Sequence, residues 1–372
     1  MIAIRRRCGE SPATFRASGL DMLGLCDVAV RLLGLGLGAA AIAQIQALRI
    51  PIGLLLVAWV AYANGSNDVS KAVATLVGSG VSNYRRAIAW GTGCTILGAG
   101  LSALTGASLV ATFASGLVAH QPTLAFATAA IVGTAGWVIL STRFGLPVST
   151  THALTGSIVV VGTFAFGPEQ IGWRTLLQRV AVPLVTSPLI GFALAVLLIL
   201  LLKGVRLRSN RGFLHWLSAG ATAAARGLND APKLGALGAL LFLTAQRSEP
   251  SASEALAITL LIAVAMGLGS YVGGRRVTET LGERVTPMND SEGFAANLAT
   301  SAMVTTAAFN GLPVSTTHVS GGAIMGIGVA AHDGRLDLSV VRDLLLAWLV
   351  TVPGAGAIAL TSWLLATALG RT

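Results

Sequence analysis

The chain has 372 residues, of which 54% are hydrophobic and only 11% are charged. Soluble domains carry about 25% charged residues, so this composition excludes a soluble domain and is typical of an integral membrane protein with many spans. The formal net charge of +10 comes from Lys and Arg in short breaks between apolar runs. That is the pattern of cytoplasmic loops and not the basic face of a nucleic-acid-binding domain. The three cysteines are unpatterned and indicate neither a disulfide framework nor a metal site.

Residues 1–50 are expected to form an N-terminal tail and an extra or interfacial helix. The arginines at 5–7 resemble the start of a signal peptide, but residues 8–19 are polar and small, so no apolar core follows directly. The segment 25–48 is apolar and is interrupted by one Asp and one Arg. It fits either an additional span or an interfacial helix.

Apolar runs continue from residue 51 to the end of the chain. At about 20 residues a span, they allow about ten to twelve membrane segments. Two runs are interrupted by glycine and polar residues. The run 51–63 ends in YANGSND and restarts as VSKAVATLVGSG, and the run 214–225 ends in ARGLND and restarts as APKLGALGALL. Each is expected to be a helix broken at membrane depth.

The chain contains an internal duplication. Asn-Asp occurs at 67–68 and again 162 positions later, and GLPVSTTH occurs at 145–152 and again 166 positions later. The order and spacing predict a first repeat with a following helix over 51–202, a basic linker over 203–213 and a second repeat with a C-terminal helix over 214–372. The charge of the linker places it in the cytoplasm. Interrupted apolar segments at matching positions of two halves are typical of a secondary transporter.

The stretch GLPVSTTH is predicted to form a tight turn between two helices. Glycine permits the turn, proline fixes φ without needing a donor, and the Ser or Thr that follows is a good N-cap for the next helix. The free N–H groups of that helix start, its positive dipole end and the hydroxyls together favour an anion. The candidate anion ligands are Ser149, Thr150, Thr151, Ser315, Thr316 and Thr317.

The two Asn-Asp pairs put carboxylates inside apolar runs. A carboxylate at membrane depth costs about 3 kcal/mol or more, so its presence marks a functional site. Oxygen ligands of this kind suit a hard cation such as Na⁺, by the logic that governs Ca²⁺ and Mg²⁺. Lys71 and Lys233 follow the two Asp residues by three positions and are expected to neutralise them or to contact an anion. The candidate cation ligands are Asn67, Asp68, Asn229 and Asp230.

His152 and His318 end the two GLPVSTTH copies. Each fits a ligand, a proton carrier or a packing residue whose ring bonds a neighbouring carbonyl. Packing is the favoured interpretation.

These residues resemble the inorganic phosphate transporter (PiT) family, whose members carry two Gly-x-Asn-Asp motifs, each followed by a GLPVSTTH-type hairpin tip. The motifs here are GSND at 65–68 and GLND at 227–230. The stretch GGRRVTETLGERVTPMNDSEGFAANLATS at 273–301 is similar to the family's segment before the second tip. The resemblance covers about residues 55–335 and implies an all-α integral membrane protein of two inverted-topology repeats with broken helices and helical hairpins.

The resemblance also implies a function. Phosphate would be held between the two tips by the six Ser and Thr residues and moved into the cell by symport with Na⁺ or H⁺, with the Asn-Asp pairs completing the anion and cation sites. The chain would lie in the cell membrane as a multi-pass transporter surrounded by lipid, alone or as a homodimer. It would have no cofactor, no nucleic-acid partner and no enzymatic activity.

Three departures from the family pattern leave the coupling ion open. Lys71 stands where the first motif usually has Asn, and Asn297 stands where the helix before the second tip usually has Glu. No acid occurs in residues 86–119, where many members have one. Fewer buried acids mean fewer ligands for Na⁺ or H⁺.

Three other functions compete with phosphate symport. Sulfate is an alternative substrate for the same fold, although buried acceptors favour phosphate, whose protons can be donated to Asp68 or Asp230. An intramembrane hydrolase would use Ser149, His152 and Asp68, but each of these residues is duplicated and a hydrolase needs one nucleophile. An anion channel would need no coupling ion.

Overall fold

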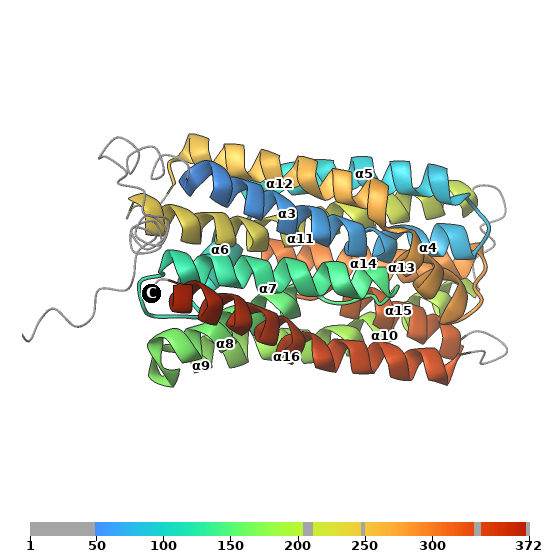
Figure 1. Cartoon of the computed structure of the whole chain (residues 1–372). Coiled ribbons are helices and arrows are strands. Elements are labelled where there is room, and N and C mark those ends of the chain that lie inside the picture. Colours follow the sequence, from blue (N-terminus) through green and yellow to red (C-terminus); the bar gives the residue numbers. More distant parts are fainter. Residues whose placement is uncertain (1–48, 204–210, 247–249, 331–335, 370–372) are drawn as a thin grey trace, which may run out of the picture.

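The computed structural model describes residues 49–203, 211–246, 250–330 and 336–369. The predictions for residues 1–50 and for most of the basic linker 203–213 therefore lie outside the described residues. The described chain is helical, and Figure 1 shows its helices side by side along one axis. The first half contains α3 (Arg49–Asp68), α4 (Ser70–Gly78), α5 (Tyr84–Leu101), α6 (Ala107–Ala114), α7 (Leu124–Arg143), α8 (Thr150–Phe166), α9 (Trp173–Thr175) and α10 (Val182–Lys203). The second half contains α11 (Arg211–Gln246), α12 (Ala252–Gly273), α13 (Arg275–Glu279), α14 (Asp290–Phe309), α15 (Thr316–Ala330) and α16 (Leu338–Leu369).

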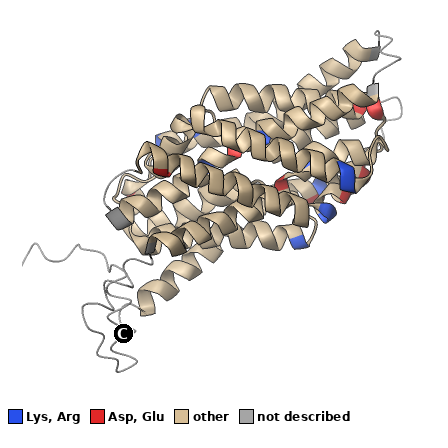
Figure 2. Ribbon diagram, turned by 90° about the horizontal axis from the view of Figure 1, so that it is seen from above, with Lys and Arg blue, Asp and Glu red and all other residues tan. Residues whose placement is uncertain are grey.

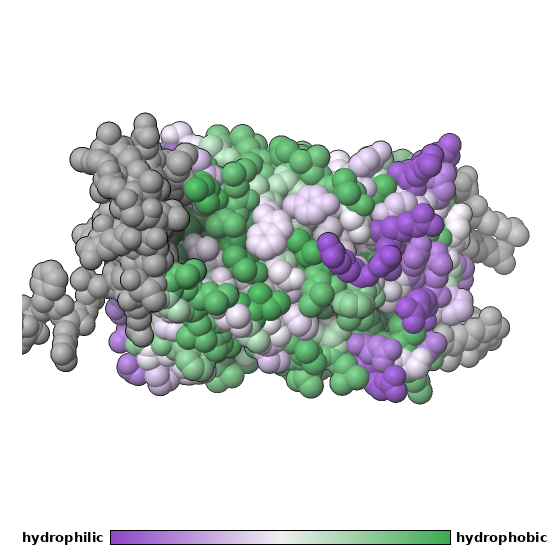
Figure 3. All heavy atoms as spheres, in the orientation of Figure 1, coloured by the Kyte–Doolittle hydropathy of each residue, from purple (hydrophilic) through white to green (hydrophobic). Residues whose placement is uncertain are grey.

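The long helices are those of a multi-pass membrane protein. Large apolar side chains such as Leu55, Leu197 and Leu349 are exposed on the outside of the bundle. Figure 3 shows apolar residues along the middle of the visible face and hydrophilic residues gathered at one end. In the described chain, six helical segments are long and apolar enough to cross a membrane: Ile50–Gly78, Tyr84–Leu104, Leu124–Arg143, Trp173–Leu202, Ala252–Gly273 and Leu338–Leu369. The helices α8, α11, α14 and α15 bring the number of long helical segments to ten.

The two halves run in opposite directions through the bundle. A short turn joins α4 to α5, so α5 runs back antiparallel to α3. The side chain of Trp90 donates to the carbonyl of Trp216, and Gly98 lies against the backbone of Ala224, so α5 and α11 are parallel. The matching helices α3 and α11 therefore point in opposite directions. This is the inverted-topology arrangement that the sequence resemblance implies.

Both GLPVSTTH copies form the predicted tips of helical hairpins. Gly145 and Gly311 have φ of 69° and 65°, in the left-handed region that glycine adopts most readily, and they turn the chain after α7 and α14. The hydroxyls of Ser149 and Ser315 then accept hydrogen bonds from the backbone N–H three residues on, and α8 and α15 begin. The prediction of helix, tight turn and helix is confirmed in both halves.

At the first Asn-Asp pair, where a break is expected, the helix has only a one-residue irregularity at Val69 between α3 and α4, and the Val69 backbone keeps helical angles (φ −58°, ψ −32°). The carbonyl of Asn67 accepts hydrogen bonds from the Ser70 hydroxyl (2.6 Å) and from the Lys71 ammonium (2.9 Å). These side chains compete with the regular backbone partner of that carbonyl, which disturbs the helix locally.

The break expected at the second Asn-Asp pair was wrong. The structure has one continuous helix, α11, which passes through Asn229 and Pro232. Proline removes one backbone donor but does not by itself end a helix that is held on both sides of it. Here α11 packs along α5 and α14, and the Pro232 ring lies against Gly106.

Charged residues are sparse along the bundle, as Figure 2 shows. One end is rich in exposed arginines, which lie at the start of α5 and after α12: Arg85, Arg86, Arg275, Arg276 and Arg284. A much smaller group of charges is buried between the helices, and this group forms the candidate site.

Candidate functional site

The site is a cluster of buried polar residues where α3, α4 and α11 pass the two hairpin tips. The buried Asp, Glu, Lys and Arg residues among those that the structure describes are five in number, and each has at most 3% of its surface exposed: Asp68, Lys71, Arg226, Asp230 and Lys233. A charge at this depth is costly unless a partner neutralises it, so the contacts of these five residues determine what the site can bind.

Each buried carboxylate is paired with the lysine that follows it by three residues. The ammonium of Lys71 lies 2.6 Å from Oδ1 of Asp68, and that of Lys233 lies 3.0 Å from Oδ1 of Asp230. Of the two alternatives expected for these lysines, the structure contains the ion pair with the preceding Asp, and contact with an anion stays a prediction. The pairing is local, because positions three apart on a helix share one face.

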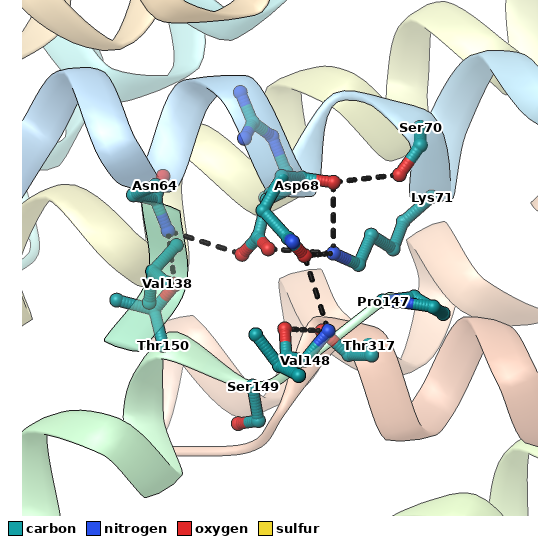
Figure 4. A network of polar contacts seen from close by, with 12 residues as sticks. Asn64, Asp68, Ser70, Lys71, Val138, Pro147, Val148, Ser149, Thr150 and Thr317 are labelled. Atoms are coloured by element: carbon teal, nitrogen blue, oxygen red, sulfur yellow. Dashed lines mark hydrogen bonds and ion pairs between the residues drawn. The ribbon is translucent and has the colours of Figure 1, made fainter. Parts of the chain in front are cut away.

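Asn64 joins the two ion pairs at the centre of the site. Its Nδ2 donates to Oδ2 of Asp68 (3.0 Å), to Oγ1 of Thr150 (3.0 Å) and to Oδ2 of Asp230 (3.4 Å). Figure 4 shows the Asn64 amide pointing toward Asp68 and Thr150. A single side chain thus contacts both carboxylates and the first tip. Sequence analysis missed this residue, although it lies one helical turn before Asp68 on the same face.

Arg226 is fully buried, and sequence analysis missed it as well. Its Nη2 donates to Oγ1 of Thr95 on α5 (2.8 Å) and to Oγ of Ser270 on α12 (3.2 Å). Its Nε and Nη1 have no hydrogen-bond partner. Arg226 follows Asn64 by 162 positions, which is the separation of the two Asn-Asp pairs. Extending the aligned motif by one residue, to NGSND and RGLND, would have found both.

Asn67 and Asn229 hold the tips in place. Oδ1 of Asn67 accepts from the backbone N–H of Val148 (3.1 Å), and its Nδ2 donates to the Leu146 carbonyl (3.0 Å). Nδ2 of Asn229 donates to the Val314 carbonyl (3.0 Å) in the same way. Each Asn therefore positions the turn of its own repeat beside the buried charges.

The tips are also tied to the opposite repeat. The ammonium of Lys233 donates to Oγ1 of Thr151 on the first tip and to the Val314 carbonyl on the second, both at 2.8 Å. The hydroxyl of Thr317 donates to the Val148 carbonyl (2.8 Å). The two helix starts, each with a positive dipole end, consequently meet at one place beside the carboxylates.

The chain matches the phosphate transporter family twice, over residues 64–213 and over residues 211–359. It is 32% identical over 320 residues to a protein of Rhizobium meliloti (strain 1021) named "Probable low-affinity inorganic phosphate transporter", covering 82% of this chain and 93% of that protein. A protein of the same name from Mycobacterium tuberculosis (strain ATCC 25618 / H37Rv) is 32% identical over 306 residues, covering 80% of this chain and 72% of the relative. The chain belongs to the phosphate transporter family.

The fold agrees with this membership. A solved structure described as "The sodium-dependent phosphate transporter" is similar with a TM-score of 0.77 over 86% of this chain and 99% of that one, at 22% sequence identity. The family model matches once in each half of the chain, and the first match begins at Asn64. The family is one of transporters, so the protein is not an enzyme.

The structure also lacks the arrangement that a hydrolase would need among these residues. The Ser149 hydroxyl accepts from the backbone N–H of His152 (3.2 Å) and serves as a helix cap. Nδ1 of His152 has no hydrogen-bond partner, and its ring packs against His318. The imidazole is thus not placed to take a proton from the serine.

His152 and His318 lie where the two hairpins meet, with ring centroids 4.4 Å apart. The ring of His318 also packs on Trp348 at 4.0 Å, and its Nδ1 lies 3.3 Å from the Leu184 carbonyl. Both histidines line an apolar cavity of about 820 Å³ between α10, α15 and α16. These contacts are those of packing residues, which is the interpretation that the sequence favoured.

Proposed function

We propose that this protein is a secondary active transporter that brings inorganic phosphate into the cell by symport with Na⁺ or H⁺. The observation that carries the proposal is the convergence of two inverted hairpin tips on two buried Asp–Lys pairs. Family membership and the names of the relatives point to the same substrate.

Phosphate would bind at the two helix starts. The first N–H groups of α8 and α15 have no partner within their helices, and the buried threonines Thr150, Thr151, Thr316 and Thr317 belong to the same first turns. Oγ1 of Thr316 is buried without a hydrogen-bond partner and is free to contact the anion. Ser149 and Ser315 act as caps that set the direction of these helices.

The coupling cation would interact with the two carboxylates. Asp68 and Asp230 both accept hydrogen bonds from the amide of Asn64. Protonation of one carboxylate, or cation binding to it, would therefore alter the hydrogen bonding of the other. Asn229 links Asp230 to the second tip. Asn67 links Lys71, the partner of Asp68, to the first tip. Both would therefore couple cation binding to tip position. Asn67, Asp68, Asn229 and Asp230 are proposed as the coupling-ion site.

The transport cycle requires this site to open alternately to each side. All the proposed ligands are buried in the structure, with 5% or less of each exposed. The arrangement corresponds to a closed site between two hairpins and two long helices. Rocking of one repeat against the other would expose the site to one side at a time.

Uptake measurements in proteoliposomes test the proposal. Sodium and pH gradients should be imposed separately, and labelled phosphate should accumulate with at least one of them. The single variants Asp68→Asn and Asp230→Asn should abolish accumulation, because each leaves a buried lysine unpaired and removes a cation ligand. If neither gradient drives phosphate uptake by the wild-type protein, the symport proposal fails.

Competition separates phosphate from sulfate. The buried acceptors Oδ1 of Asn64 and Oδ1 of Asn229 have no partner in the structure and can accept a hydrogen bond from an O–H group of dihydrogen phosphate. Sulfate carries no such proton at neutral pH. Unlabelled phosphate should therefore displace labelled phosphate far better than sulfate does, and full displacement by equal sulfate would refute phosphate selectivity.

A further inference from the structure

The buried cluster carries an excess of positive charge. It contains the carboxylates of Asp68 and Asp230 and the cations of Lys71, Lys233 and Arg226. With all five ionised, three positive charges face two negative charges. Each lysine neutralises one carboxylate in an ion pair, so the positive charge of the Arg226 guanidinium has no negative partner.

Arg226 lies one helical turn before Asp230 on α11 and forms no ion pair with either buried carboxylate. Its one bonded nitrogen is anchored by Thr95 and Ser270, and Nε and Nη1 remain unpartnered although fully buried. Leaving a buried charged donor unsatisfied is costly, so the site is arranged to receive an anion that satisfies it.

The carboxylate oxygens are already engaged. Oδ1 of Asp68 accepts from Lys71, Oδ1 of Asp230 accepts from Lys233, and both Oδ2 atoms accept from Asn64. A hard cation needs several such oxygens at once and would also face ammonium groups about 3 Å from its ligands. Sodium would therefore have to displace a lysine and add a fourth positive charge to the cluster.

We propose that Lys71, Lys233 and Arg226 are fixed cations that take the place of a bound sodium ion, and that Arg226 supplies the positive charge that binds the phosphate anion. The inference rests on the proposed phosphate transport and narrows its coupling to a mechanism that needs no sodium. The anion class is a tetrahedral oxyanion that brings one negative charge, as dihydrogen phosphate does. Asn64, the counterpart of Arg226 in the first repeat, supplies an uncharged amide to the same site.

Equilibrium binding of labelled phosphate to the purified full chain tests the role of Arg226. Arg226→Gln should weaken binding by about tenfold or more, the loss expected for a charge-assisted contact, and Arg226→Lys should restore part of it. The control Arg179→Gln removes an exposed arginine and should leave binding unchanged. Wild-type affinity in Arg226→Gln would overturn the proposal.

Replacing sodium by choline tests the role of the lysines. Wild-type phosphate binding and pH-driven uptake should not change without sodium. In the double variant Lys71→Asn/Lys233→Asn the carboxylates are free, and phosphate binding should become sodium-dependent. A wild-type protein that takes up phosphate only with sodium would overturn this inference and leave the transport proposal intact, whereas no uptake under any gradient would refute the transport proposal itself. These sodium measurements test the lysines even if Arg226→Gln does not fold, and the phosphate affinity of Arg226→Lys at a pH gradient of zero is then compared with that of Arg179→Gln to test Arg226.

Discussion

At the scale of single residues, the two repeats differ in charge at one pair of positions in the site. Asn64 and Arg226 occupy corresponding places before the two Asn-Asp pairs, yet one is an amide that bridges both carboxylates and the other is a guanidinium with two free nitrogens. The two repeats have the same fold but thus differ in charge at the buried site between α3 and α11. The amide organises the site, and the guanidinium supplies its excess charge.

Substitution of Asn64 tests its bridging role. Asn64→Ala removes hydrogen bonds to two buried carboxylates, which are each worth about 1.5–3 kcal/mol. Phosphate uptake should fall about tenfold or more. The control Asn310→Ala removes an exposed amide that bonds only within its own helix and should retain wild-type uptake. Equal uptake by both variants would contradict the bridging role.

Substitution of the two capping serines tests whether the repeats contribute equally. Ser149→Ala and Ser315→Ala each remove one N-cap hydrogen bond and should lower stability by about 1 kcal/mol. Thermal unfolding in detergent should show similar losses for both, while Ser115→Ala, at an exposed helix end, should show less. A complete loss of function from Ser149→Ala with none from Ser315→Ala would instead indicate a single nucleophile.

At the scale of elements, helices of the two repeats pack closely against each other at glycine residues. Helix α3 of the first repeat packs on α12 of the second, and Gly65 and Gly269 let the two backbones touch. A Cβ on Gly65 would lie 2.0 Å from the Met266 carbonyl oxygen, and one on Gly269 would lie 2.0 Å from that of Tyr62. The close approach brings α3, and with it Asn64 and Asp68, against the second repeat.

This contact predicts a difference between two glycine substitutions. Gly65→Ala places a methyl group against rigid backbone and should destabilise the protein by about 1–3 kcal/mol. Gly100→Ala on α5 meets no atom within 4 Å and should be neutral or stabilising by up to about 1 kcal/mol. Thermal unfolding of the two variants gives the comparison, and equal effects would mean that the α3–α12 contact is not tight.

At the scale of the whole molecule, charge predicts the orientation in the membrane. The exposed arginines after α12 and at the start of α5 lie at one end of the bundle, which the positive-inside rule places in the cytoplasm. The start of α12 lies at the other end, because its 22 residues span about 33 Å.

Thiol labelling tests this orientation. In a background with Cys8, Cys26 and Cys94 replaced by Ser, a membrane-impermeant reagent should label Glu283→Cys from the cytoplasmic side only. Ser253→Cys, in the first turn of α12, should be labelled from the opposite side only. The reverse pattern would invert the assigned orientation.

Much of the fold and part of the site follow from residue spacing. Composition indicates a membrane protein, and the repeated Asn-Asp and GLPVSTTH stretches predict two repeats with hairpin tips. The Asp–Lys pairs also follow from spacing, because three positions on a helix decide which side chains are neighbours. The second helix break could not be decided this way, since the sequence at Pro232 is compatible with a break and with a helix held together by its neighbours.

The sequence by itself located four of the five buried charged residues, because acids inside apolar runs are few and the two lysines follow them by three positions, but it did not single out Arg226. Only the tertiary structure decided what they contact. Asn64 meets Asp230, Lys233 meets Thr151, and Arg226 meets residues on two other helices. These partners lie between 44 and 166 positions apart, and their meeting depends on how inverted helices pack. Spacing along the sequence determines which side chains are neighbours within one helix. The charge balance of the site depends on how the helices pack together, because its charged residues come from different helices.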